Sequence, residues 1–321
     1  MGRYLLRRLA FLVVSLVMAS VVLFVLLRLL PGDPANALTS VGASPEQIAA
    51  ARHSIGSDRP LPEQFTHWLG QLACGDLGTS FVSSLPVGPE VSARLSVTVP
   101  LTLAAFVLAV LVAVPVGFVA AHKRHTWYGA LLSGVSQLGM AVPVFWLGMI
   151  LIAVFALNAG WLPAGGFPQD GWAAPADAVR SLVLPVVTIA LVMSASLIRY
   201  VRSATLDVLG SDHLRTARAL GASFPAAMWR HGLRNASAPV ISVLGIELAS
   251  TLLGAVVVES VYALPGLGSL LATGMAQHDY PVIQGVLFVS TLAVLLIGFV
   301  ADLVQRFIDP RLRRRLSGAA R

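Results

Sequence analysis

Charged residues are scarce in this chain. Only 12% of its 321 residues are Asp, Glu, Lys or Arg, whereas 56% are hydrophobic. A soluble globular domain carries about 25% charged residues, so the deficit excludes an ordinary water-soluble fold and indicates that lipid is the main solvent. The net charge of +7 does not indicate nucleic-acid binding, because no surface of basic and aromatic residues accompanies it.

Two further scarcities exclude particular kinds of site. Cys74 is the only cysteine, so the chain forms no internal disulfide and no cysteine metal cluster. Lys123 is the only lysine, and no GxxxxGKS/T loop contains it, so the chain does not hydrolyse ATP by that route. Because His122 and His125 flank Lys123 and Arg124, we expect an exposed basic loop here rather than a metal site.

Ionisable residues are also rare within the apolar segments. Glu247 is the only one inside a long apolar run, while Glu259 and Asp302 lie near the ends of such runs. An ion-coupled carrier usually places carboxylates or histidines within its spans, so there is little support for a proton relay. The HExxH pair of membrane zinc proteases is absent, and no motif supports Ser/His/Asp catalysis. An enzyme is therefore disfavoured.

Long apolar runs are what the chain has in abundance. An uncharged run from Leu9 to Leu27 follows three arginines and is about long enough to cross a bilayer. It is longer than a signal-peptide core, and no small-x-small cleavage site follows it. We therefore expect a retained helix within residues 1–30, ended by Pro31-Gly32-Asp33-Pro34. Five further spans are predicted at about 97–121, 128–157, 181–201, 238–258 and 282–305.

The predicted fold class is thus an all-α membrane protein with six transmembrane helices. Pro115 and Pro143 fall inside predicted spans, where neighbouring groups can satisfy the freed carbonyls. Ahead of the second span, Ser44-Pro45-Glu46 has the pattern of a helix start, and residues 64–72 have an amphipathic pattern. The sequence of residues 75–78, Gly-Asp-Leu-Gly, predicts a turn.

The basic residues predict the orientation. With the N-terminus inside, the cytoplasmic segments hold 17 of them and the outer side holds 5, so the positive-inside rule predicts N-in and C-in. Residues 31–95, with six acids and three bases, then form a large extracytoplasmic segment after the first helix. The transmembrane domain covers 96–310 and includes a cytoplasmic loop at 202–237. Residues 311–321 form a basic cytoplasmic tail.

A polar, arginine-bearing island, Ser211 to Pro239, interrupts the apolar runs. Ser211 or Asp212 can cap a helix that continues to Leu220, and Gly221 can end it in the left-handed conformation. Ser223 and a proline after it predict a second short helix. Leu214, Ala217 and Leu220 would share an apolar edge. Such a pair of helices suits a socket in another protein, although an interfacial loop on anionic lipid fits the same residues.

Several motifs in the island and elsewhere resemble one known family. HLRTARALGAS followed by RHGLRNASAPV is similar to the "EAA" loop of ABC-importer permeases, in the variant found in the dipeptide/oligopeptide/nickel permease family. RLLPGDPA, WLGQLACGDLGTSF, RLSVTVPLTLAAF, VVVESVYALPGLGSLL and HDYPVIQGV resemble that family's B-type (dipeptide permease B-like) subunit, so the likeness covers nearly the whole chain. Two features depart from the pattern. Arg215 stands where the general loop has Glu, and Ala104-Ala105 stand where many members have an acid.

The resemblance implies a fold, a site and partners. It implies the type I ABC-importer fold in a bacterial inner membrane, with a second, C-type permease, two ATPase subunits and an extracytoplasmic binding protein. ATP and Mg would be bound by the ATPases, and this chain would bind no cofactor. Dipeptides or short oligopeptides are the default substrate; nickel, heme and other small solutes are the alternatives. The coupling residues would be His213, Leu214, Arg215, Thr216, Ala217, Arg218, Ala219, Leu220 and Gly221.

Four other residues are candidates for the substrate path or its gate. Glu247 either lines the path or is a buried acid bonded to a neighbouring span. Glu259 opens the ESVYALPGLG segment, where Pro265 and Gly266 predict a tight turn before a short re-entering helix. The 31–95 segment likewise has two interpretations. It either caps the outer ends of the spans, or it contacts the binding protein or its ligand.

Overall fold

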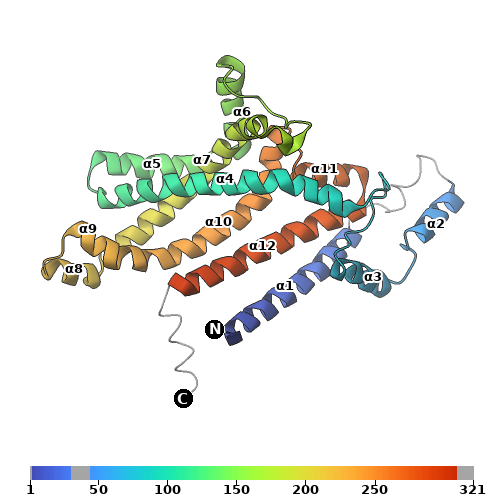
Figure 1. The fold of residues 1–321 in the computed structure, drawn as a ribbon, viewed down its shortest axis with the longest axis horizontal. Coiled ribbons are helices and arrows are strands. Elements are labelled where there is room, and N and C mark those ends of the chain that lie inside the picture. The colour runs from blue at the N-terminus through green and yellow to red at the C-terminus, as the bar shows by residue number, and fades with distance from the viewer. Residues whose placement is uncertain (1, 30–43, 309–321) are drawn as a thin grey trace. The chain divides into compact units, whose positions relative to one another are not determined.

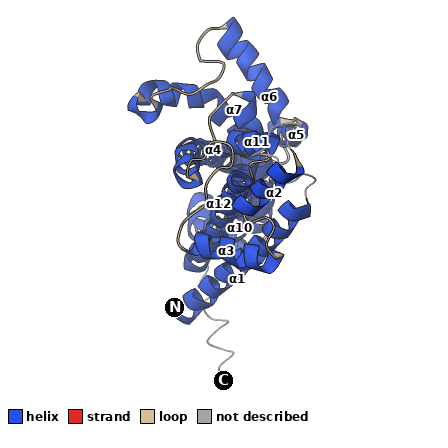
Figure 2. Ribbon diagram, turned by 90° about the vertical axis from the view of Figure 1, so that its right-hand side faces the viewer, coloured by secondary structure: helices blue, strands red, loops and turns tan. Residues whose placement is uncertain are grey.

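The computed structural model describes residues 2–29 and 44–308, which form helices joined by loops with no strand among them (Figure 2). The all-α fold class is therefore confirmed. The predicted turn at 31–34 and the basic tail lie outside the described residues. The chain divides into two compact units: the first unit is residues 1–99 with 263–296, and the second unit is residues 100–262 with 297–321.

The membrane-spanning helices follow the apolar runs. Five helices are long and apolar enough to cross a membrane, and a sixth span results if one bent pair is counted as a single crossing. In the first unit, α1 (Gly2–Leu29) is followed by α2 (Pro45–Ser54) and α3 (Leu61–Ala73). The remaining long helices are α4 (Val87–His122), α7 (Pro175–Leu209), α10 (Leu233–Val261) and α12 (Tyr280–Ile308).

The short helices of the first unit form where the sequence predicts them. Ser44 caps α2, because its hydroxyl accepts from the Gln47 N–H at 3.3 Å while the Gln47 side chain accepts from the Ser44 N–H at 2.9 Å. This reciprocal pair is a capping box. Helix α3 packs on α1 through aromatic rings, with Phe24 lying 5.3 Å from Phe65 and 6.0 Å from Trp68 between ring centroids.

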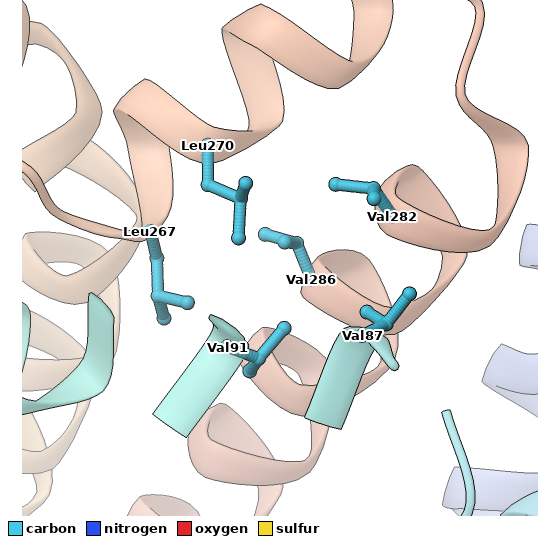
Figure 3. Close-up of a cluster of buried hydrophobic side chains, with 6 residues drawn as sticks. All are labelled: Val87, Val91, Leu267, Leu270, Val282 and Val286. Atoms are coloured by element: carbon cyan, nitrogen blue, oxygen red, sulfur yellow. The ribbon is translucent and has the colours of Figure 1, made fainter. Parts of the chain in front are cut away.

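A small apolar core holds the first unit together. It joins the start of α4, the start of α12 and α11 (Leu267–Gln277). Each helix contributes two side chains three or four residues apart, which lie on one helix face. Figure 3 shows the six side chains directed toward one another; they are Val87, Val91, Leu267, Leu270, Val282 and Val286.

A buried carboxylate fixes the loop before α4. Asp279 is only 2% exposed, and its carboxylate accepts from the Phe81 N–H at 3.1 Å and from the Ser80 hydroxyl. Burying a charge is costly unless it is hydrogen-bonded, so these bonds tie residues 80 and 81 to the start of α12. Sequence reasoning assigned no role to Asp279, because its partners lie about 200 positions away along the chain.

Helix α7 is the centre of the second unit. It packs against α5 (Trp127–Ala141), α6 (Val144–Leu151) and α10 (Figure 1). Small residues allow the close approach: a Cβ on Gly139 of α5 would lie 2.9 Å from the Cβ of Ala195 on α7. Such small residues are typical of helix interfaces in membranes, where packing rather than water exclusion drives association.

The predicted span at 128–157 is broken near its middle. Helices α5 and α6 are bent by 101° at the break between them. Val142, the residue before Pro143, has φ −79° and ψ 123°, because a following proline disfavours the helical conformation of the residue before it. Pro143 then starts α6, which continues as the π-helix η2 (Ile152–Asn158). A short 3-10 helix, η3 (Gly171–Ala173), precedes α7.

Three helices extend beyond the predicted spans. Helix α4 begins at Val87, inside the segment predicted at 31–95. Helix α7 runs to Leu209 and α10 begins at Leu233, both within the loop predicted at 202–237. At 1.5 Å per residue, the 36 residues of α4 measure about 54 Å, whereas the hydrocarbon layer is about 30 Å thick. Hydropathy therefore locates the crossing and not the helix ends.

Candidate functional site

The predicted coupling residues form a short helix and the turn that ends it. Helix α8 (Asp212–Ala219) is followed by α9 (Phe224–Ala227) and the π-helix η4 (Met228–Gly232). Figure 1 shows α8 beside α9, between the end of α7 and the start of α10, and the two short helices are in contact. The sequence predicted this pair of helices.

Gly221 terminates α8 in the way that the sequence predicts. Its φ is +91°, in the range that favours glycine. The Ala222 N–H bonds to the Ala217 carbonyl at 3.1 Å, and the Gly221 N–H bonds to the Arg218 carbonyl at 3.0 Å. These two bonds constitute a Schellman motif. No atom lies within 4 Å of an added Cβ, so backbone conformation is the only obstacle to a larger residue here.

The predicted side-chain cap by Ser211 is wrong. Ser211 occupies the N-cap position, but its hydroxyl donates to the Val208 carbonyl at 2.7 Å and caps no N–H of α8. Asp212 lies within the first turn, with an oxygen 3.8 Å from the guanidinium of Arg215. Arg215, which replaces the acid of the general motif, therefore turns back toward Asp212. Both side chains are exposed.

The predicted apolar edge of α8 is divided. Leu214 is 4% exposed and Ala217 is half-buried, whereas Leu220 is 84% exposed. Each three-residue step turns the side chain by about 60° around the helix axis, so two steps place Leu220 about 120° from Leu214. Leu214 anchors α8 to its own chain, and Leu220 presents an apolar surface outward.

Aromatic contacts attach α8 and α9 to the end of α4. The Phe224 ring stacks on His122, with 4.8 Å between centroids, and the Arg218 guanidinium lies 5.9 Å from the Phe224 centroid. His122 also stacks on Phe118 of α4. Cation–π and ring contacts of this kind add to the area that they bury. The short helices are therefore held to α4, while η4, which follows α9, contacts α7 and α10.

Glu247 lies midway along α10 and contacts the neighbouring span. The Ser196 hydroxyl of α7 donates to one carboxylate oxygen at 2.7 Å. The acid is half-buried and also lines an open hollow. The sequence allowed either a buried acid bonded to a neighbouring span or an acid that lines the path. Glu247 has the bond that the first interpretation predicts, and it also faces open space.

The other path candidates are distributed over both units. Glu259 is fully buried on α10, in the second unit. Pro265 and Gly266 belong to the first unit, where the Gly266 N–H bonds to the Leu264 carbonyl at 2.9 Å and α11 begins at the next residue. The predicted tight turn and short helix are present. The roles of these residues in a path stay predictions.

Tyr262 is a residue that sequence reasoning missed. It is 1% exposed, and its hydroxyl lies 2.7 Å from the Thr188 hydroxyl and donates to the Gly148 carbonyl at 3.2 Å. Its own carbonyl accepts from the Gly166 N–H at 2.8 Å. One side chain thus joins α6, α7 and the end of α10. The only signal in the sequence was its place within the VYALPGLG motif.

The first unit contains a cavity of about 550 Å³. Arg28, Gln64, Trp68 and His53 are among the residues that line it. The hydrogen bond from His53 holds the pKa of the exposed Asp58 carboxyl below its usual value. Within residues 2–29 and 44–308, no group of three or more His, Cys, Asp or Glu residues is placed to hold a metal ion.

Comparison with known proteins gives matches over nearly the whole length. Residues 113–314 match the family described as "Binding-protein-dependent transport system inner membrane component", and residues 1–102 match the corresponding N-terminal family. The glutathione transport system permease protein GsiC of Escherichia coli (strain K12) is 37% identical over 313 residues, which cover 98% of this chain and 99% of GsiC. GsiC of Salmonella typhimurium (strain LT2) has the same identity and coverage.

The fold has solved relatives. Two inward-facing crystal forms of the MetNI methionine ABC transporter match with TM-scores of 0.57 and 0.55. Each match covers 68% of this chain and 96% of the solved chain, at 18% sequence identity. At this identity the likeness establishes the fold.

Tyr262→Phe should lower the stability of the second unit. The change removes the hydroxyl shared by Thr188 and Gly148 but keeps the ring, so the expected loss is about 1–2 kcal/mol. A shift of roughly 2–4 °C per kcal/mol is expected in the thermal unfolding of the detergent-purified protein. Tyr200→Phe is the matched control, because the Tyr200 ring is partly exposed. Equal melting temperatures for both variants would contradict the joining role of Tyr262.

Proposed function

The chain belongs to the family of inner membrane components of binding-protein-dependent transport systems, and we propose that it imports dipeptides or short oligopeptides. It is the permease subunit of an ABC importer and a transport subunit rather than an enzyme. The observation that carries the peptide assignment is the 37% identity to permeases named for glutathione, which is itself a small peptide.

We propose that this subunit forms half of a path completed by a second, related permease. Two ATPase subunits or domains supply the energy by binding ATP and Mg, and an extracytoplasmic binding protein delivers the substrate. The composition supports this division of labour, because the chain has one lysine and no phosphate-binding loop around it. With both termini inside, as the positive-inside rule predicts, α8 and α9 would face the ATPases.

Helix α8 is the proposed contact with an ATPase. Three observations support this role: Leu220 is almost fully exposed, Gly221 ends α8 in a hydrogen-bonded turn, and Phe224 stacks on His122 of α4. ATP binding would close the ATPases and draw the α8 helices of the two permeases together. A rigid helix end transmits such a displacement better than a flexible loop does.

The outer segment has a structural role in part of its length. Residues 80 and 81 are tied to Asp279, and Trp68 packs on Phe24 of α1. These contacts support a cap over the outer helix ends for residues 61–86. The net acidity of the segment favours attraction of a basic surface or a peptide amino terminus, so contact with the binding protein is proposed for the exposed part around α2.

Co-purification and reconstitution test the proposed function. A tagged chain should bring down a second permease and the ATPases. The assembly in proteoliposomes, supplied with its binding protein, should take up labelled dialanine or glutathione only when ATP is present. Uptake by this chain alone, or uptake driven by an ion gradient without ATP, would overturn the assignment. Mass spectrometry of the ligand held by the binding protein would identify the substrate.

Leu220→Asp should weaken the ATPase contact. Burial of a leucine side chain contributes about 1.5–3 kcal/mol, so its replacement by a charge should weaken association at least tenfold. Recovery of the ATPases on the tagged permease measures this. Leu220→Met keeps an apolar side chain and should behave like the natural protein. Full ATPase recovery with Leu220→Asp would place the docking surface elsewhere.

Gly221→Val should impair transport while the assembly survives. A β-branched residue at φ +91° is strained by about 1–3 kcal/mol, which would shift the end of α8 without removing its contact residues. ATP-dependent uptake should fall severalfold, with unchanged co-purification. Gly221→Asn tolerates positive φ better and is the matched control. The same uptake from the valine variant and the natural protein would refute the proposed role of Gly221 in holding the end of α8.

A further inference from the structure

The second unit contains an open hollow of about 220 Å³ between α6, α7 and α10. Its walls are mostly apolar, and the polar residues among them are Ser196, Glu247, Ser250 and Thr251. Glu247, Ser250, Thr251 and Gly254 are spaced three, four and seven residues apart, so they lie on one face of α10. Gly254 has no atom within 4 Å of an added Cβ, which leaves this face open.

The Glu247 carboxylate is only partly satisfied. One oxygen accepts from the Ser196 hydroxyl at 2.7 Å. The other oxygen has no hydrogen bond and no ion pair within the described part of the chain. The Thr251 hydroxyl donates to the backbone carbonyl of Glu247 at 2.8 Å and so does not neutralise the carboxylate. The hollow therefore presents a carboxylate that has no cationic partner among the described residues.

A carboxylate in the middle of a span is costly without a cation or water. Its surroundings are suited to an ammonium group, which has three N–H donors. Oxygen acceptors are available from the free oxygen of Glu247 and from the Ser250 and Ser196 hydroxyls. A site built from one carboxylate and hydroxyls binds weakly enough to release its ligand, and transport through a path requires such release.

We propose that Glu247, with Ser196 and Ser250, binds the α-ammonium group of a peptide during its passage. The inference rests on the proposed function, because the cation that an importer of peptides carries through its path is this group. Ser196 orients the carboxylate, and the apolar walls accept the neighbouring side chain of the peptide. A basic side chain of the second permease is the competing occupant, and the test distinguishes the two.

Chemical protection is the direct test. In the purified assembly with its ATPases and second permease, dicyclohexylcarbodiimide should modify Glu247, as followed by mass spectrometry. Dialanine at millimolar concentration should slow this modification at least threefold, and N-acetyl-dialanine should not. Protection by both peptides or by neither would overturn the proposal. Absence of modification under all conditions would also overturn it, because the carboxylate would then be closed off by a partner.

Measurements of dialanine uptake distinguish a failure of the role of Glu247 from a failure of the proposed function. Glu247→Gln should reduce dialanine uptake about tenfold or more, since a charge-assisted bond is lost. Glu90→Gln, which changes an acid paired with Arg94 outside the hollow, should leave uptake unchanged. If the natural assembly takes up no peptide, the proposed function fails. If it takes up dialanine and Glu247→Gln does so equally well, only the role of Glu247 fails.

Discussion

Every polar group that enters the hydrocarbon must find its partner inside the protein, and this constraint shapes the whole chain. It requires helices, and it also governs the hydroxyl side chains within them. Thr188, Thr205 and Thr251 each donate to a carbonyl four residues earlier in their own helix. These hydroxyl groups are hydrogen-bonded within their own helix, so they leave no unsatisfied donor facing lipid. The Glu247 carboxylate is less completely satisfied, because a hydroxyl bonds to only one of its oxygens.

The sequence was sufficient to predict the helical class, the approximate positions of the apolar spans and the pair of short helices within residues 211–239. These features depend on local composition: apolar runs, glycine after a helix, and serine before one. Features that depend on contacts between distant residues were not predictable. Tyr262 joins three helices, and Asp279 holds a loop about 200 residues away. Neither contact leaves a periodic pattern in the sequence.

Two sites show where local rules compete. Pro143 lies in an apolar run long enough for one span, but its effect on Val142 breaks the helix and produces the bend of 101°. Ser211 has the right position for a helix cap, yet its hydroxyl bonds to the preceding helix instead. In the same segment, Gly221 ends α8 as the sequence predicts, because few residues other than glycine adopt a positive φ. Strong backbone preferences are thus predictable, whereas side-chain partners are not.

Helix α4 belongs to both compact units, and this has a mechanical consequence. The boundary between the units falls at Val99 and Pro100, inside the helix. Proline supplies no N–H, so the helix lacks one rung of its hydrogen-bond ladder there. At its far end the same helix carries His122, which stacks on Phe224 beside α8. A displacement of α8 would therefore act on a helix that contains two prolines, Pro100 and Pro115, and the missing backbone N–H groups make these the places where α4 bends most easily.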